Sequence, residues 1–373
     1  TPWYRPTRVN HVISGAEFGW RNGTGKWPAY YPDSFGSAVD IGPGSPTGIC
    51  FGYGANFPKK YQDALFICDW SYGNIHAVHL TPDGSSYGGT YETFATAAPL
   101  PVTDITVHPD GGLYFTIGGR RTQSALYRIR YTGDERDGSE VATDANASKL
   151  RELRHKIEST HVAAPSAENL ALAIENLGHS DRAIRFAARI ALEHQPVGEW
   201  RDKVVELSDP QARIIGVVAL ARNGEPGDRD AALAALTDLS WDELTDGQQI
   251  DLLRAYGLVA IRLGGIKGDG AEAVLEQLSG KFPTGDNAVN RELAKMLVYL
   301  NSAEATGKIV AELRSSPSQE NQIAYAMVLR GAKKGWKPEL HKDYFTWFSD
   351  IQSARGGMSF GGFIENIKKA ALE

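Results

Sequence analysis

Two kinds of sequence meet at a polar, glycine-flanked stretch, Thr132-Gly133-Asp134-Glu135-Arg136-Asp137-Gly138-Ser139. Most of the aromatic residues lie before this stretch, a bias that favours β structure. The sequence after it is rich in Ala, Leu, Glu, Arg and Lys, which are strong helix formers. The stretch therefore predicts a linker at residues 134–145, between a β domain at residues 1–133 and a helical domain at residues 146–373.

Short strand-like runs separated by turn residues fill the second half of the β domain. Turns such as Pro82-Asp83-Gly84 and Pro109-Asp110-Gly111 are typical of hairpins. Four strand-like segments are followed by a second set that begins at Pro99, and such sets of four are typical of propeller blades. We therefore expect the final blades of a partial β-propeller. A generic β-sandwich is the alternative. An open arc would expose strand edges, so we expect the remaining blades to be missing from this chain. The expected strands are residues 47–53, 64–70, 74–80, 90–96, 104–108, 113–117 and 126–131.

Apolar residues recur with helical spacing throughout the last two thirds of the chain. Ser180-Asp181 and Ser208-Asp209-Pro210 are signals for helix starts. Helix pairs recur at an interval of roughly 30–40 residues, which is the period of HEAT and armadillo repeats. The pattern therefore predicts a HEAT-like α-solenoid, with a plain helical bundle as the alternative. The expected main helices are residues 181–194, 209–222, 248–263, 289–300 and 322–330.

Composition excludes several classes of function. The net charge of −6 argues against nucleic acid as a partner. No apolar run reaches the roughly 18 residues of a membrane helix. The two cysteines, Cys50 and Cys68, are too few for a four-cysteine metal site. They fall on consecutive expected strands, where a disulfide and a pair of buried thiols are both open alternatives.

The loops of the β domain carry the candidate site. In a propeller, the loops at residues 44–47, 69–74, 99–104 and 118–124 would meet at one rim of the central channel. Carboxylates, guanidinium groups and aromatic faces together suit a sugar or polyol ligand. Asp69 and Asp104 are the candidate catalytic residues, as general base or as oxygen ligands of Ca²⁺, and no other metal is expected. The candidate substrate-binding residues are Trp70, Tyr72, Thr103, Arg120, Arg121 and Gln123. The alternative is that both aspartates brace turns and that the arginines pair with rim carboxylates.

One irregular, aromatic insertion interrupts the N-terminal part of the β domain. It runs from Arg21 to Asp33 and contains Trp27, Tyr30 and Tyr31. Its position near the predicted rim makes it a candidate lid. The alternative is a segment packed on the outside of a blade.

Several motifs resemble a known family. Asn10–Trp20, Pro99–Asp104 and Ile117–Ser124 are similar to loops of glucose or sorbosone dehydrogenase-like six-bladed propellers. They closely resemble the PVC-type haem-binding, membrane-bound dehydrogenase family, whose members join a propeller, a HEAT-repeat region and a C-terminal cytochrome c domain. Tyr344–Phe348 and Gly356–Phe363 look like the family segment that precedes the cytochrome.

The resemblance implies part of a periplasmic or envelope-associated oxidoreductase that acts on a sugar or alcohol and passes electrons to a cytochrome. Ser71, Pro101 and Thr103 stand where quinone-binding relatives have a Lys and two Arg, which argues against pyrroloquinoline quinone. No Cys-x-x-Cys-His occurs, so haem c is expected only on a missing C-terminal domain. We expect this piece alone to lack complete catalytic machinery. The alternative is a non-catalytic carbohydrate-binding or protein-interaction scaffold, with a partner held by the solenoid.

Overall fold

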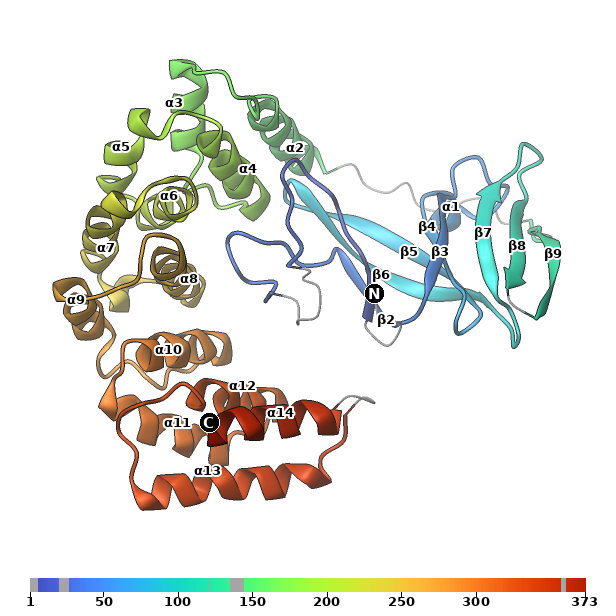
Figure 1. The fold of residues 1–373 in the computed structure, drawn as a ribbon. Coiled ribbons are helices and arrows are strands. Elements are labelled where there is room, and N and C mark those ends of the chain that lie inside the picture. Colours follow the sequence, from blue (N-terminus) through green and yellow to red (C-terminus); the bar gives the residue numbers. More distant parts are fainter. Residues whose placement is uncertain (1–5, 20–26, 120, 135–143, 357–359) are drawn as a thin grey trace. The chain divides into compact units, whose positions relative to one another are not determined.

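The computed structural model describes residues 6–19, 27–119, 121–134, 144–356 and 360–373, and these divide into two compact units (Figure 1). The first unit holds the described residues up to Ala29 together with Ser34–Lys156. The second unit holds Ile157–Glu373 together with a short, distant segment, Tyr30–Asp33. The second unit is therefore assembled from two separate parts of the sequence.

Three antiparallel sheets make up most of the first unit. The first contains β1 (Pro6–Val9) and β2 (Val39–Pro43). The second contains β3 (Pro46–Phe51), β4 (Leu65–Asp69), β5 (Asn74–Asp83) and β6 (Ser86–Thr96). The third contains β7 (Val102–Val107), β8 (Leu113–Gly119) and β9 (Thr122–Ile129). Two helices accompany the sheets, α1 (Lys59–Gln62) and α2 (Ala145–Glu158).

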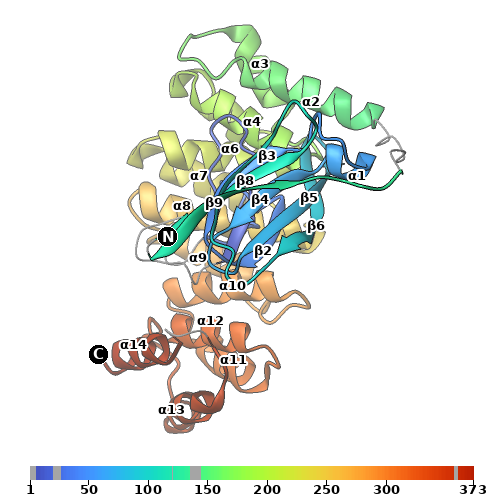
Figure 2. The ribbon, with the colours of Figure 1, turned by 90° about the vertical axis from the view of Figure 1, so that its right-hand side faces the viewer.

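The four-stranded sheet lies between the other two, and its alternating side chains form two apolar clusters (Figures 1 and 2). Successive residues of a strand point to opposite faces of a sheet. Phe66 accordingly packs with Ile105 and Leu113 of the three-stranded sheet. Leu65, one residue earlier, packs with Val39 of β2 on the opposite face. Each sheet thus buries an apolar face against its neighbour, which is the main stabilising contribution in this unit.

The predicted partial β-propeller is wrong. The described residues form three small antiparallel sheets, none of which closes on itself, and no six-bladed ring is seen among them. The strands themselves lie close to their predicted positions; β4, for example, spans Leu65–Asp69 where residues 64–70 were expected. Turn residues and the alternation of apolar and polar residues specify local hairpins, but they do not specify how many sheets form or how the sheets pack.

The second unit is helical, as its composition predicts. Asp181 and Asp209 accept hydrogen bonds from the first turns of α4 and α6, which confirms the two predicted helix starts. The helices are α3 (Ala167–Glu175), α4 (Arg182–Glu193), α5 (Arg201–Val205), α6 (Pro210–Asn223), α7 (Arg229–Thr237), α8 (Asp246–Arg262), α9 (Asp269–Leu278), α10 (Asn287–Tyr299), α11 (Ala303–Ser315), α12 (Gln319–Leu329), α13 (Pro338–Asp350) and α14 (Phe360–Leu372).

These helices form consecutive layers (Figure 1). One row consists of α4, α6, α8, α10 and α12, and each contacts the next. A second row includes α5, α7 and α9, which also contact one another in order. Stacking of this kind gives each helix a buried stripe and leaves side chains of one row aligned along a common face. Whether the repeats belong to the HEAT class stays a prediction.

No helix within the described ranges has the length and apolar character needed to cross a membrane. The periplasmic or envelope location stays a prediction of the sequence.

Candidate functional site

The candidate catalytic aspartates both accept hydrogen bonds from backbone N–H groups. Asp69 is buried, and its Oδ1 accepts from the N–H groups of Ser45 at 2.7 Å and Ser71 at 3.0 Å. Asp104 is exposed, and its Oδ1 accepts from the N–H of Ile105 at 2.9 Å. Bonds of this kind stabilise turns and bulges, which matches the alternative of turn-bracing residues.

Two of the candidate substrate-binding residues lie together on a shallow surface of the first unit. Trp70 and Thr103 line an open cavity of about 980 Å³ with residues of β8 and β9. The Trp70 indole donates to the carbonyl of Gly118 at 2.8 Å, and Thr103 Oγ1 lies 2.8 Å from Thr116 Oγ1. The structure therefore combines these two side chains, but each already has a partner within the protein.

The remaining candidates do not join that cavity. Tyr72, Arg121 and Gln123 are exposed and are not among its lining residues. Arg121 has a φ of 63°, in the left-handed region of a tight turn. Arg120 lies outside the described residues.

Cys50 and Cys68 are free thiols on neighbouring strands of the four-stranded sheet. Burial raises the pKa of Cys50 to about 11 and that of Cys68 to about 12. Both groups stay protonated at neutral pH, so neither has the thiolate character of a reactive cysteine. Among the described residues, no group of three or more His, Cys, Asp or Glu side chains is arranged to hold a metal ion.

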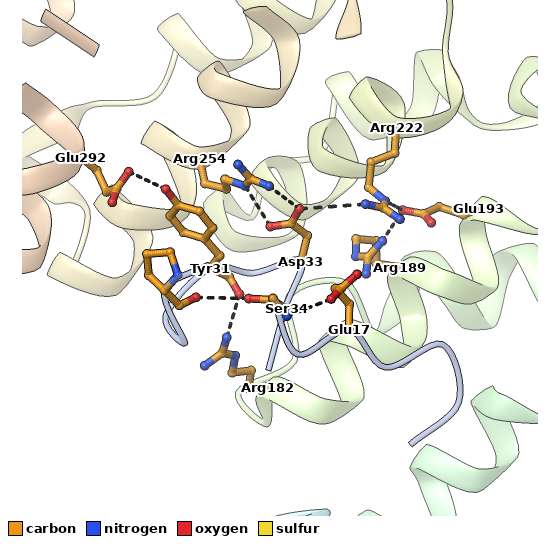
Figure 3. A network of polar contacts seen from close by, with 12 residues as sticks. Glu17, Tyr31, Asp33, Ser34, Arg182, Arg189, Glu193, Arg222, Arg254 and Glu292 are labelled. Atoms are coloured by element: carbon orange, nitrogen blue, oxygen red, sulfur yellow. Dashed lines mark hydrogen bonds and ion pairs between the residues drawn. The ribbon is translucent and has the colours of Figure 1, made fainter. Parts of the chain in front are cut away.

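A different site, which the sequence did not reveal, lies in the helical unit (Figure 3). There the segment Tyr30–Asp33, with the sequence Tyr-Tyr-Pro-Asp, is held by side chains from α4, α6, α8 and α10. These are four consecutive helices of one row. We call this arrangement the segment site.

The acidic end of the segment is the most strongly held. Arg254 binds the Asp33 carboxylate through two hydrogen bonds, Nε to Oδ1 at 2.9 Å and Nη2 to Oδ2 at 2.7 Å, and the Asp33 side chain is fully buried. Arg222 lies 3.9 Å from Oδ2. Burial alone would raise the pKa of Asp33, but the bonds and charge of Arg254, with the charges of Arg189 and Arg222, hold it below its ordinary value. Asp33 is therefore a buried carboxylate that stays ionised.

The aromatic end of the segment is bound by one glutamate. The hydroxyls of Tyr30 and Tyr31 donate to the two carboxylate oxygens of Glu292, at 2.7 and 2.8 Å. The guanidinium of Arg254 lies 4.3 Å from the centre of the Tyr31 ring, which is a cation–π distance. Burial, followed by the charge of Glu292, raises the pKa of both tyrosines. Arg182 donates to the backbone carbonyl of Tyr31 at 2.7 Å.

A cavity of about 340 Å³ adjoins the segment and is lined partly by Tyr30 and Pro32. Its polar lining includes Arg182, Gln211 and Asp251. Burial raises the pKa of Asp251 to about 6, although Gln211 donates a hydrogen bond to its carboxylate at 2.8 Å. This aspartate titrates close to neutrality, which is common at binding sites.

The insertion that contains this segment differs from both expectations at Tyr30–Asp33, since these residues pack within the helical unit rather than as a lid or on a blade. One signal for the site was present in α4. Arg182, Arg189 and Glu193 are spaced so that they share one face of the helix. Charged side chains on a buried helix need oppositely charged or hydrogen-bonding groups nearby. The sequence did not indicate which distant segment supplies them.

No protein-family model and no curated protein matches this chain.

Proposed function

We propose that this chain is a non-catalytic binding protein whose helical unit recognises an extended peptide with two aromatic residues followed shortly by an acidic one. This is the protein-interaction scaffold considered from the sequence. The observation that carries the proposal is that four consecutive helices contribute polar contacts to Tyr30, Tyr31 and Asp33. Stacked helical repeats commonly bind extended ligands along one row of helices.

The contacts support recognition of both backbone and side chains. Arg182 binds a main-chain carbonyl and would accept any sequence at that position. Glu292, which also pairs with Lys295 at 2.8 Å, accepts one hydrogen bond from each tyrosine hydroxyl, so a peptide without these hydroxyls would lose two hydrogen bonds. Arg254 forms paired bonds with a carboxylate, a geometry that favours an acidic residue over its amide. A peptide without the acid would lose both charged hydrogen bonds to Arg254, and this loss gives selectivity.

In this chain the site is occupied by the protein's own segment. A partner peptide must compete with a ligand that is covalently attached, whose effective concentration is typically in the millimolar range. The proposal therefore includes a cis-occupied resting form. A partner with higher affinity, or one that draws the segment away, would be required for binding in trans.

The test uses the full chain with its segment disabled by Tyr30→Ala, Tyr31→Ala and Asp33→Ala. A fluorescent peptide containing Tyr-Tyr-Pro-Asp should bind this variant saturably in an anisotropy titration, and bind the unmodified chain at least about tenfold more weakly. The same peptide with Asn in place of Asp should lose about tenfold or more in affinity, because a charged hydrogen-bonded pair is lost.

Two further variants make the result specific. Added to the triple variant, Arg254→Gln should abolish peptide binding, whereas Arg314→Gln, which alters an exposed ion pair elsewhere in the helical unit, should not. Circular dichroism checks that the helices remain folded. If the folded triple variant fails to bind the peptide, the segment is a structural strap and the proposal is wrong.

The sugar or alcohol dehydrogenase activity implied by the family resemblance, with its cytochrome partner, stays a prediction. A dye-linked oxidation assay with a panel of sugars, with and without Ca²⁺, measures it directly.

A further inference from the structure

A second cavity, separate from both the predicted rim and the segment site, lies within the first unit and has a volume of about 1490 Å³. Its floor is the face of β3, β4 and β5 that carries Ile49, Ile67 and Leu80. The strands β1 and β2 form one wall, and the first turns of α2 contribute Ser148 and Arg151. These five strands and one helix thus contribute to one space, which is larger than most small-molecule pockets.

Two residues that line this cavity, Asn10 and Arg151, each have a buried polar atom without a hydrogen-bond partner in the described part of the chain. Among the described residues, no hydrogen-bond partner is found for Oδ1 of Asn10 or for Nη1 of Arg151. The rest of the Arg151 guanidinium is fixed, since Nη2 donates to Ser148 Oγ at 3.1 Å and the group lies 5.4 Å from the centre of the Tyr87 ring. Two residues of one cavity therefore each have an unsatisfied atom, one an acceptor and the other a donor. Buried polar groups are rarely left unpaired, so this arrangement points to a ligand with hydroxyl and acidic groups.

An exposed aromatic pair lines another part of the same cavity. The rings of Phe51 and Tyr53 stack at 4.9 Å with an angle of 8°, and they are 41% and 64% exposed. Large exposed aromatic surfaces are unusual on a solvated protein and mark interaction sites. Flat aromatic faces pack well against the C–H faces of sugar rings.

The Arg151 guanidinium, which lies over Tyr87, and the aromatic pair Phe51 and Tyr53 are separated by more than the width of one sugar ring. Phe51 pairs with Leu65, which pairs with Val78 of β5, whereas Tyr87 pairs with Pro82 of the same strand. Four residues of strand correspond to about 13 Å. A ligand that reaches both features must be extended.

The charge of the lining favours an acidic ligand. Lys59 is paired with Asp63 at 3.0 Å, and the Asp144 carboxylate accepts N–H groups at the start of α2. Arg8 donates to the carbonyl of Phe18 at 2.8 Å. Arg151 Nη1 is a buried donor for which no partner is found among the described residues, and carboxylates and sulfates are strong acceptors for a guanidinium.

From these observations we infer that the cavity binds an acidic oligosaccharide. Arg151 Nη1 donates to its carboxylate or sulfate group, Asn10 Oδ1 accepts from a neighbouring hydroxyl, and Phe51 and Tyr53 pack against a ring further along the chain of sugars. This inference does not depend on the proposed peptide recognition, because every residue that it uses lies in the first unit.

The test is a binding screen of the full chain against uronate- and sulfate-bearing oligosaccharides and neutral oligosaccharides of matched length. We expect one acidic member to bind with a 1:1 stoichiometry in isothermal titration calorimetry. Arg151→Gln should weaken it by roughly tenfold or more and should reduce the preference over the neutral counterpart. Tyr53→Ala should weaken acidic and neutral ligands alike.

Matched controls lie on the same unit outside the cavity. Tyr127→Ala removes another exposed aromatic ring, and Arg130→Gln removes another exposed charge; both should leave affinity unchanged. The inference is overturned if no acidic oligosaccharide binds at millimolar concentration, or if the two cavity variants bind as well as the controls. It is also overturned if Tyr53→Ala instead dissociates an oligomer that binds no sugar, since the aromatic face would then be a subunit interface.

Discussion

Asp33 and Arg254 form the most buried ion pair of the segment site, and they contribute to stability only as a pair. Asp33→Asn removes the negative charge that pairs with Arg254, whose side chain is only 10% exposed. Breaking a buried pair in this way costs about 3–5 kcal/mol. We expect the helical unit of Asp33→Asn to unfold at a clearly lower urea concentration, followed by far-ultraviolet circular dichroism. The double variant Asp33→Asn with Arg254→Met should recover part of this loss, and strict additivity of the two changes would contradict the pairing.

Asp251 gives the helical unit a specific dependence on pH. Its folded pKa of about 6 exceeds the ordinary value of 3.8, so the folded chain holds the proton more tightly than the unfolded chain. This group's contribution to stability therefore falls as the pH rises from about 4 to about 6, by on the order of 2–3 kcal/mol. Urea titrations should show Asp251→Asn gaining stability relative to the unmodified chain across that range. A difference that does not change with pH would show that Asp251 has an unshifted pKa.

The chemistry of individual residues was only partly predictable. Asp69 and Asp104 were expected either as catalytic groups or as turn braces, and both accept backbone N–H groups. This local bonding is readable from sequence because the partners of Asp69 and Asp104 include near neighbours. The partners of Asp33 are not local, since 221 residues separate it from Arg254. Spacing along the chain carries no information about such a pair.

Among the structural elements, β3 and β7 approach each other unusually closely. A Cβ atom added at Gly48 would lie 2.5 Å from Cα of Asp104, so the contact is with backbone that cannot move aside. Gly48→Ala should therefore push the four-stranded and three-stranded sheets apart, at a cost of about 1–3 kcal/mol or more. Gly88→Ala in β6 is the matched control, because its new Cβ meets only Asp83 Cβ at 4.0 Å. Thermal melts followed by near-ultraviolet circular dichroism should separate the two variants; equal melting temperatures would refute the close packing.

Elements were predicted better than their assembly. The apolar period and the caps at Asp181 and Asp209 located α4 and α6 within a residue or two. The alternation of apolar and polar residues, together with turn residues, likewise located β3 to β9, whereas β1 and β2 were not expected. The predicted partial propeller was wrong because the assembly of sheets depends on how residues such as Phe66 and Ile105 pack between them, and these contacts join parts of the chain that no periodicity connects.

At the scale of the whole molecule, the second unit is incomplete without Tyr30–Asp33. A fragment containing only residues 157–373 should unfold at a lower urea concentration than the same helices in the full chain. Adding a Tyr-Tyr-Pro-Asp peptide should raise the midpoint in proportion to the logarithm of its concentration, as expected for a ligand of the folded state. An unaffected midpoint at saturating peptide would mean that the segment contributes nothing to the fragment's stability.

The segment Tyr30–Asp33 is synthesised long before the helices that bind it. The ribosome adds Arg254 221 residues after Asp33, which takes roughly 10–40 s at ordinary elongation rates. Throughout that time a pair of tyrosines and an acid must stay accessible while the neighbouring strands are already able to pair. A gene fragment that starts after residues 132–139 encodes the helices without Tyr30–Asp33, so a single recombination event would transfer this unit without its segment and with lower stability.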